Sequence, residues 1–184
     1  YSSFQNDLIV NSSSIGSYAF YGCKTGNSIK LSIGFTSILS HAFERFGDYK
    51  NEILLDFCYK NRNNDKRIID NSAFNESGIS GNIVIPNYYN LIGNHSFFNC
   101  KGIKSVEINF VDQQSYYYNS YIRSIGESAF EGCIKMTKLV LNSNGGMKKI
   151  GKRAFYSLNI ENELILPSSL ELIDDSAFEN CTKL

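Results

Sequence analysis

Apolar residues recur along this chain at fixed offsets from an isoleucine. The fourth residue after the Ile is Ala in six copies and Ser96 in the seventh, and the fifth residue is always Phe. The eighth residue is usually Cys or another apolar residue. Offsets 0, 4, 5 and 8 share one face of a helix, but such a segment is too short to be stable alone. We therefore expect a one- or two-turn helical element held by its Phe in a common core. The copies start at Ile15, Ile38, Ile69, Ile92, Ile125, Ile150 and Ile173.

A second apolar pattern follows each block at offsets 14 and 16. A spacing of two is typical of a short strand with one buried face. In the second copy the pair slips by one residue, to Ile53 and Leu55, and the segment 7–10 fits the strand of an earlier, truncated repeat. The regular pairs are Ile29/Leu31, Ile83/Ile85, Val106/Ile108, Leu139/Leu141 and Leu164/Leu166.

The spacing of the blocks predicts a repeat architecture. The starts lie 23 to 33 residues apart, and 23 is the commonest interval. One strand and one short helical turn per 20–29 residues describes a leucine-rich-repeat solenoid. We expect one domain over residues 1–184, with about seven repeats after a partial repeat at 1–14. The chain stops before the seventh repeat's strand, so we also expect it to be part of a longer protein.

The motif Ile-Gly-x-x-Ala-Phe-x-x-Cys, followed by Ile-x-Ile-Pro, resembles the BspA-like class of leucine-rich repeats. The segment 125–133 carries the first motif in full, whereas Phe46, Ser77 and Leu158 replace the Cys elsewhere. The resemblance implies an α/β solenoid, a right-handed coil with a parallel sheet on its concave face and short helical turns carrying Ala-Phe-x-x-Cys. It also implies a cell-surface or secreted protein with a role in adhesion.

The cysteines fit the core better than a chemical site. Four of the five share an offset with Phe46 and Leu158, so we interpret them as small buried hydrophobes. The alternative is a disulfide between Cys100 and Cys133 on neighbouring rungs. A rung spacing of about 5 Å permits it, but the parallel side-chain directions disfavour it. Cys58 lies outside the pattern and is the expected exposed thiol.

Charge and motifs exclude several functions. Eighteen basic and 18 acidic residues give a net charge of zero, which argues against a nucleic-acid or membrane-surface binder. We expect no membrane insertion within this segment, since no apolar run reaches 18 residues. The two histidines, His41 and His95, occupy repeats two apart, and no metal, nucleotide or hydrolase motif occurs. We therefore expect no metal, no cofactor and no enzyme activity.

Two insertions break the repeat. The strand-to-Ile connection is seven residues in regular copies but 14 after Leu55 and 17 after Ile108. Tyr offers contact area and Arg directional donors, so the insertions are candidate partner-binding loops that we expect side by side on one flank. The alternative is a pair of tolerated surface loops. The candidate residues are Tyr59, Arg62, Lys66, Arg67, Tyr116, Tyr117, Tyr118 and Tyr121.

The strand residue between each buried pair is expected on the concave face. These residues are Lys30, Leu54, Val84, Glu107, Val140 and Ile165. We include Val84, Val140 and Ile165 among the partner-binding candidates, although ordinary β-propensity explains them equally well.

The favoured function is a non-enzymatic protein-binding module of a cell-surface or secreted adhesin. Its expected partner is a protein or a glycan-bearing macromolecule. One alternative is a structural spacer array. The other is an intracellular, cytoplasmic interaction scaffold, because a reducing cytosol suits unpaired cysteines.

Overall fold

The seven repeat isoleucines line up in one parallel sheet of short strands. The computed structural model describes residues 3–4, 7–25, 28–31, 37–47, 53–57, 67–86, 89–109, 123–141 and 146–184. Each repeat Ile closes a strand that pairs in register with its neighbour, as Ile92 does with Ile125. In chain order the strands are β3 (Ser14–Ile15), β6 (Ser37–Ile38), β8 (Arg67–Ile69), β10 (Tyr89–Ile92), β12 (Ser124–Ile125), β14 (Lys149–Ile150) and β15 (Leu172–Ile173).

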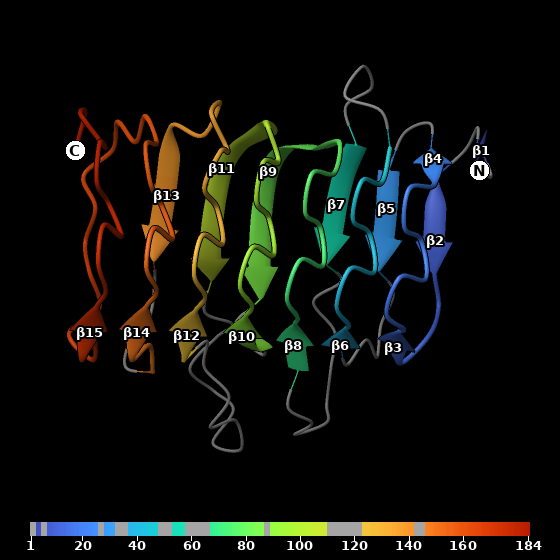
Figure 1. Ribbon diagram of the computed structural model, residues 1–184, viewed down its shortest axis with the longest axis horizontal. Helices are drawn as coiled ribbons and strands as arrows, with labels where there is room; N and C mark the ends of the chain where they lie inside the picture. Colours follow the sequence, from blue (N-terminus) through green and yellow to red (C-terminus); the bar gives the residue numbers. More distant parts are fainter. Residues whose placement is uncertain are drawn as a thin grey trace.

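A second parallel sheet stands beside the first and carries the paired apolar residues, except that the strand predicted at Leu164/Leu166 is wrong, since these residues lie outside any strand. Its six strands follow chain order across the sheet, so successive repeats lie side by side in a row (Figure 1). The strand of the expected partial repeat pairs with that of the first full repeat, Leu8 with Ile29 and Val10 with Leu31. The strands are β2 (Leu8–Val10), β5 (Ser28–Leu31), β7 (Ile53–Phe57), β9 (Ile79–Pro86), β11 (Gly102–Asn109) and β13 (Lys138–Leu141), and a two-stranded sheet pairs β1 (Ser3–Phe4) with β4 (Lys24–Thr25).

The register of β7 corrects the predicted slip in the second repeat. Leu55 lies opposite Ile29 and Phe57 opposite Leu31, so the equivalent pair is Leu55/Phe57 rather than Ile53/Leu55. Leu54 instead lies opposite Ser28 and is 54% exposed. Both pairs satisfy an alternation of two, and only pairing with the neighbouring strand distinguishes them.

The Ala-Phe-x-x-Cys segments are turns, and the predicted helical turns are wrong for the described residues. Each block places two residues at positive φ, for example Ser128 (52°) and Gly132 (79°). A left-handed residue interrupts a right-handed helix. Successive backbone N–H groups alternate between hydrogen bonds within their own rung and hydrogen bonds to the next rung. Ala154 N donates to Gly151 O of the same rung (3.2 Å), whereas Phe130 N donates to Ala154 O of the next rung (2.9 Å).

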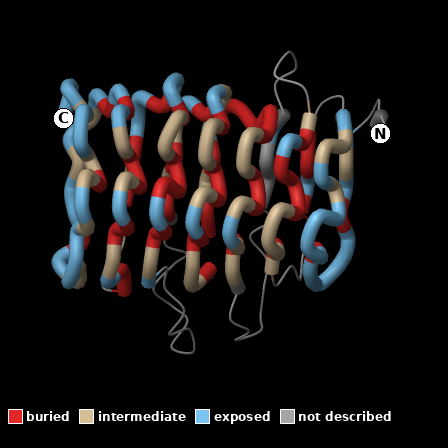
Figure 2. Tube along the Cα trace, in the orientation of Figure 1, coloured by how far each residue is buried: buried red, intermediate tan, exposed pale blue. Residues whose placement is uncertain are grey.

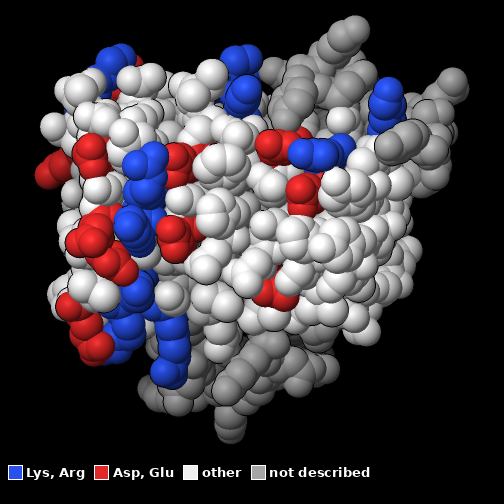
Figure 3. Space-filling view, in the orientation of Figure 1, with Lys and Arg blue, Asp and Glu red and all other residues white. Residues whose placement is uncertain are grey.

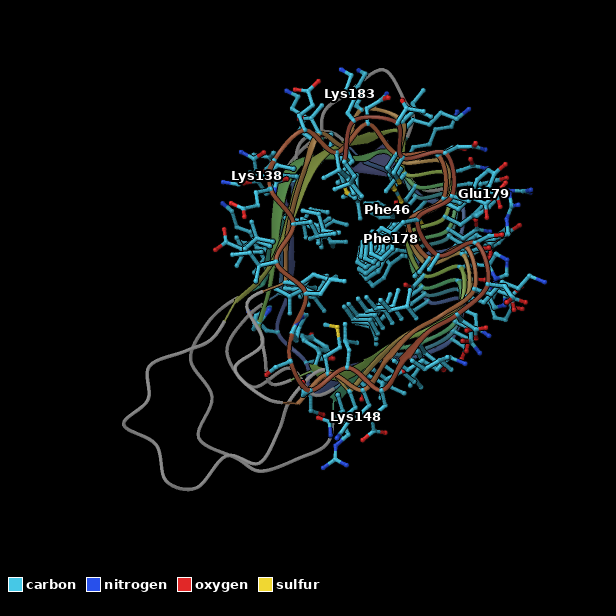
Figure 4. All side chains as sticks on the ribbon, turned by 90° about the vertical axis from the view of Figure 1, so that its left-hand side faces the viewer. Phe46, Lys138, Lys148, Phe178, Glu179 and Lys183 are labelled. Carbon is cyan, nitrogen blue, oxygen red and sulfur yellow. The ribbon has the colours of Figure 1, made fainter. Side chains whose placement is uncertain are left out.

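These turn segments form a third wall, and the core lies inside the three walls. End-on, the rungs superpose into one ring with Phe46 and Phe178 pointing inward (Figure 4). Buried residues recur in every rung along the row (Figure 2). The stack of parallel strands is therefore solenoid-like, while its right-handed coil and the concavity of the six-stranded sheet stay predictions.

The predicted phenylalanine column is confirmed. Neighbouring rings stack face to face with centroids 5.0–5.4 Å apart. The five inner rings are fully buried, whereas Phe20 and Phe178 on the outermost rungs are partly buried. Each inner ring thus gains apolar burial and two aromatic contacts.

Candidate partner-binding surface

The outward face of the six-stranded sheet brings two of the candidate valines into one row. Val84, Glu107 and Val140 pair in register across β9, β11 and β13, and all three are half-buried. The adjacent row contains Asn82 and Ser105, whose hydroxyl donates to Asn82 Oδ1 at 2.8 Å. The face therefore combines small apolar contacts with fixed hydrogen-bonding groups.

Exposed apolar residues extend this face at both ends. Ile165 lies beyond the last strand of the sheet and is 74% exposed. Ile9, which sequence reasoning did not select, is 59% exposed and lies opposite Lys30 in register. Its position between inward Leu8 and Val10 was the signal that could have identified it.

The ends of the two insertions lie at equivalent places in the stack. The first connection leaves β7 after Phe57 and reaches β8 at Arg67, and the second leaves β11 after Asn109 and reaches β12 at Ser124. In the two sheets, β9 separates β7 from β11, and β10 separates β8 from β12. The strand that carries Val84 therefore lies between the points where both insertions begin.

Most of the insertion candidates lie outside the described residues. Arg67 is the first residue of β8, but its side chain is not described. The predicted packing of the two insertions against each other stays a prediction. The candidates outside the described ranges are Tyr59, Arg62, Lys66, Tyr116, Tyr117, Tyr118 and Tyr121.

Ion pairs join neighbouring rungs along β14 and β15, at the C-terminal end of the seven-stranded sheet. Lys148 Nζ lies 2.5 Å from Glu171 Oε1, and Lys149 Nζ lies 2.8 Å from Asp174 Oδ2. Figure 3 shows a basic column flanked by acidic groups on this side of the molecule. The Lys149 ammonium group, with the Asp175 N–H, holds the pKa of Asp174 below its usual value. Sequence reasoning missed these pairs, although Lys148 and Glu171 occupy the same offset in successive repeats.

A denser network surrounds Glu131 on the turn wall. Arg153 binds both carboxylate oxygens, at 3.0 Å from Nε and 2.5 Å from Nη2, and the Ser128 hydroxyl donates at 2.8 Å. The Arg153 guanidinium also lies 3.6 Å from the ring centroid of Tyr156. Hydrogen bonding from Arg153 lowers the pKa of Glu131, although burial opposes this shift. The two parallel hydrogen bonds from the Arg153 guanidinium satisfy the charge of the Glu131 carboxylate within the protein. Because these residues come from neighbouring rungs, the network stabilises the stacking of the rungs.

The cysteines at the repeat offset are free and chemically protected. Cys100 and Cys133 are fully buried, and their thiols donate to the carbonyls of Phe74 (3.0 Å) and Phe97 (3.2 Å). Burial raises the pKa of Cys100 to about 12 and that of Cys133 well above its usual value. Cys23 and Cys181 are free and partly buried, and Cys58 lies outside the described residues. The core interpretation is confirmed for Cys100 and Cys133, which have little thiolate character.

The histidines stay on separate rungs. His41 stacks on Tyr18 with centroids 4.6 Å apart, and His95 packs edge-on to Phe98 at 5.4 Å. Within the described ranges, no group of three or more His, Cys, Asp or Glu side chains is arranged to hold a metal ion. Nor does this part of the chain contain a helix with the length and apolarity to cross a membrane.

One strand in each of two parallel sheets per repeat, with a wall of turns between them, defines a leucine-rich-repeat protein. The chain belongs to the BspA type leucine-rich repeat family, whose model matches six copies over residues 2–110 and 109–184. Repeats of this family indicate a protein-interaction module and often occur in surface or secreted proteins.

One solved structure is similar to this chain. It is a leucine-rich repeat protein from Bacteroides ovatus, 18% identical, with a TM-score of 0.48. The match covers 97% of this chain and 53% of that protein, so this chain spans about half its length. A search of curated proteins finds no match.

Proposed function

We propose that this chain is a non-enzymatic binding module of a cell-surface or secreted adhesin. Its partner is a protein or a glycan-bearing macromolecule, which contacts the outward face of the six-stranded sheet and the two insertions together. The observation that carries the proposal is the position of β9: Val84 lies between the strand ends from which both insertions leave. A partner on the sheet face would therefore meet both insertions.

The physical properties of the sheet face support this role. Its backbone is fixed by parallel pairing on both sides of β9 and β11, so side chains there lose little backbone entropy on binding. Val84 and Val140 supply apolar contacts, and Glu107 between them provides a hydrogen-bond acceptor. Small apolar contacts with polar neighbours are typical of non-obligate interfaces.

The test compares variants of each part of the surface. One variant shortens both insertions to the seven-residue connection of regular repeats. A second replaces Val84 and Val140 with Lys, and a matched control replaces Ser17 and Asn159, which are exposed elsewhere, with Lys. Beads coated with each protein are tested for adhesion to cultured mammalian epithelial cells, and far-UV circular dichroism checks the fold.

We expect the wild type and the control to adhere equally, and each surface variant to lose most adhesion. Wild-type beads that do not adhere would refute the adhesin assignment. If the loop-shortened protein folds and adheres as well as the wild type, the insertions are surface loops that do not contribute to binding. Unchanged adhesion of the double Lys variant would remove the sheet face from the interface.

A further inference from the structure

Two tyrosines are exposed on the turn wall in the first full repeat. Tyr18 is 58% exposed and Tyr21 is 39% exposed, and their ring centroids lie 5.8 Å apart with the rings tilted by 55°. On the described turn wall of the first three repeats, no other large hydrophobic side chain is exposed. We call these two residues, together with Arg45 of the second repeat, the tyrosine cluster. The offsets of the two tyrosines, 3 and 6, hold polar residues in most other repeats, so the repeat pattern does not account for the rings.

Tyr18 occupies a backbone position that is unfavourable for an aromatic residue. The third residue after the repeat Ile has a positive φ in all seven copies, and in three of them it is Ser. Tyr18 has a φ of 59°, and a bulky side chain in this left-handed region costs conformational free energy. Its ring stacks on His41 at 4.6 Å, yet more than half of the residue stays exposed, so burial recovers little of this cost. Backbone strain that packing does not offset is typical of functional positions.

Hydrogen bonds fix the cluster across three neighbouring rungs. Arg45 Nη1 donates to the Tyr21 hydroxyl at 3.3 Å, and Arg45 Nε donates to Glu76 Oε2 at 2.9 Å. A guanidinium has five N–H groups and a phenol that accepts a hydrogen bond keeps its own proton, so Arg45 and Tyr21 still have donors for a ligand. The Arg45 side chain is 59% exposed. Oriented polar groups thus lie beside exposed rings, and this order lowers the entropy cost of binding.

The charges near the tyrosine cluster favour an uncharged ligand. Glu76 binds Arg45, and the buried Glu44 contacts His41. Two carboxylates therefore accompany one guanidinium, so an anionic group gains little attraction here. Figure 3 shows few charged side chains over the N-terminal half of this side of the molecule, whereas charged groups are frequent over its C-terminal half.

The exposed rings and their polar neighbours match the chemistry of a neutral sugar. A pyranose presents weakly positive C–H groups on a ring face and hydroxyls at its rim, and an aromatic face carries partial negative charge. A sugar stacked on Tyr21 would bring its hydroxyls to Arg45. Two rings match one or two sugar units, whereas a standard protein interface spans about 20–30 residues a side. The rings of Tyr18 and Tyr21 contact each other, so no aromatic cage for an organic cation lies between them.

We propose that the tyrosine cluster binds a neutral sugar unit of a glycan. Tyr18 and Tyr21 stack on the C–H face of the sugar, and Arg45 and the Tyr21 hydroxyl donate to its hydroxyls. These contacts are mostly uncharged, so the affinity should change little with salt and should not rise when the sugar carries a carboxylate. The site lies on the turn wall, whereas the proposed adhesin surface comprises the sheet face and the insertions, so each proposal can fail without the other.

Lactose, a neutral disaccharide, is the probe for this site, and saturation-transfer NMR measures its binding. The test variant, Tyr18→Ser with Tyr21→Asn, introduces the residues that the third repeat has at these offsets, Ser72 and Asn75. The matched control, Tyr156→Asn, removes the tyrosine at the same offset as Tyr21 in the sixth repeat. We expect the test variant to lose at least tenfold in affinity for lactose and the control to lose less than twofold.

Two further variants separate ring stacking from hydrogen bonding. Tyr18→Phe with Tyr21→Phe keeps both rings, so its affinity for lactose should stay within fivefold of the wild type. Arg45→Gln removes the guanidinium donors and should lower the affinity at least threefold. 3′-Sialyllactose adds a carboxylate to the same disaccharide and should bind no more tightly than lactose.

Tyrosine nitration of the wild type gives a test that does not depend on the folding of variants. Lactose should protect Tyr18 and Tyr21 from tetranitromethane more than it protects Tyr156. No lactose binding at 20 mM, equal protection of Tyr156, or an equal loss of affinity in the test variant and the control would overturn the proposal. Tighter binding of 3′-sialyllactose than of lactose would overturn the assignment to a neutral sugar.

Discussion

Replacing Phe130 with Ala tests the column of stacked rings at its most enclosed point. Phe130 is fully buried, with parallel ring neighbours at 5.1 Å (Phe97) and 5.4 Å (Phe155). Its backbone N–H also bonds to the next rung, at Ala154 O. Backbone pairing should therefore survive the substitution, while the ring's packing is lost.

The expected loss is large because the neighbouring rings are themselves held in register. Truncation of a buried Phe costs about 3–5 kcal/mol, which includes two aromatic contacts of about 0.5–1.5 kcal/mol each. Phe178 has one stacked neighbour, Phe155 at 5.2 Å, and is only partly buried. Phe178→Ala should therefore lower the free energy of unfolding by roughly half as much.

Urea denaturation followed by far-UV circular dichroism measures both variants, since the chain has no tryptophan for fluorescence. Repeat proteins gain stability from nearest-neighbour contacts, so an inner gap should weaken the stack on both sides. The reasoning is refuted if Phe130→Ala costs no more than Phe178→Ala, because enclosure between two rings would then contribute nothing.

Three further substitutions test other features. Ser96 replaces the repeat Ala and is fully buried, and its hydroxyl has no hydrogen-bond partner within the described residues, so Ser96→Ala should raise the free energy of unfolding by about 1 kcal/mol in urea titrations; a loss would contradict this. A Cβ atom added at Gly126 would lie 2.5 Å from backbone atoms, whereas one added at Gly16 would have no atom within 4 Å. Gly126→Ala should therefore lower the free energy of unfolding by about 1–3 kcal/mol, and Gly16→Ala by about 0.5 kcal/mol or less. Hydrogen bonds from Arg153 lower the folded-state pKa of Glu131. The wild type should therefore have a higher free energy of unfolding than Glu131→Gln, and this difference should be fully present above about pH 5 and shrink as the pH falls below about 4. A difference that does not change with pH from 3 to 7 would refute the prediction.

Features fixed within one repeat could be predicted from the sequence. The Phe column follows from a single offset that recurs in every copy, and four of the six strand pairs follow from an alternation of two. Burial of Cys100 follows from sharing its offset with Phe46 and Leu158. In each case the sequence contains the whole signal, because the same side-chain environment repeats.

Features that depend on contacts between repeats could not be predicted. Offsets 0, 4, 5 and 8 suit a helix. Hydrogen bonds between rungs, such as that from Phe130 N to Ala154 O, favour a series of turns instead. The choice between Ile53/Leu55 and Leu55/Phe57 depends on β5, which is far away in sequence. The fork between Arg153 and Glu131 likewise becomes visible only after the rungs are stacked.

The stack separates surfaces that can bind independently. The core fixes the residues at offsets 0, 4, 5 and 8, so the sheet face and the turn wall are free to differ in chemistry. Arg153 on the turn wall and Lys149 in β14 are satisfied by carboxylates of neighbouring rungs, which makes the C-terminal half of these two walls a poor ligand surface. Val84 and Lys135 lie on different surfaces and share no neighbour in register. Their substitutions should therefore act additively on stability, while only Val84→Lys should reduce cell adhesion.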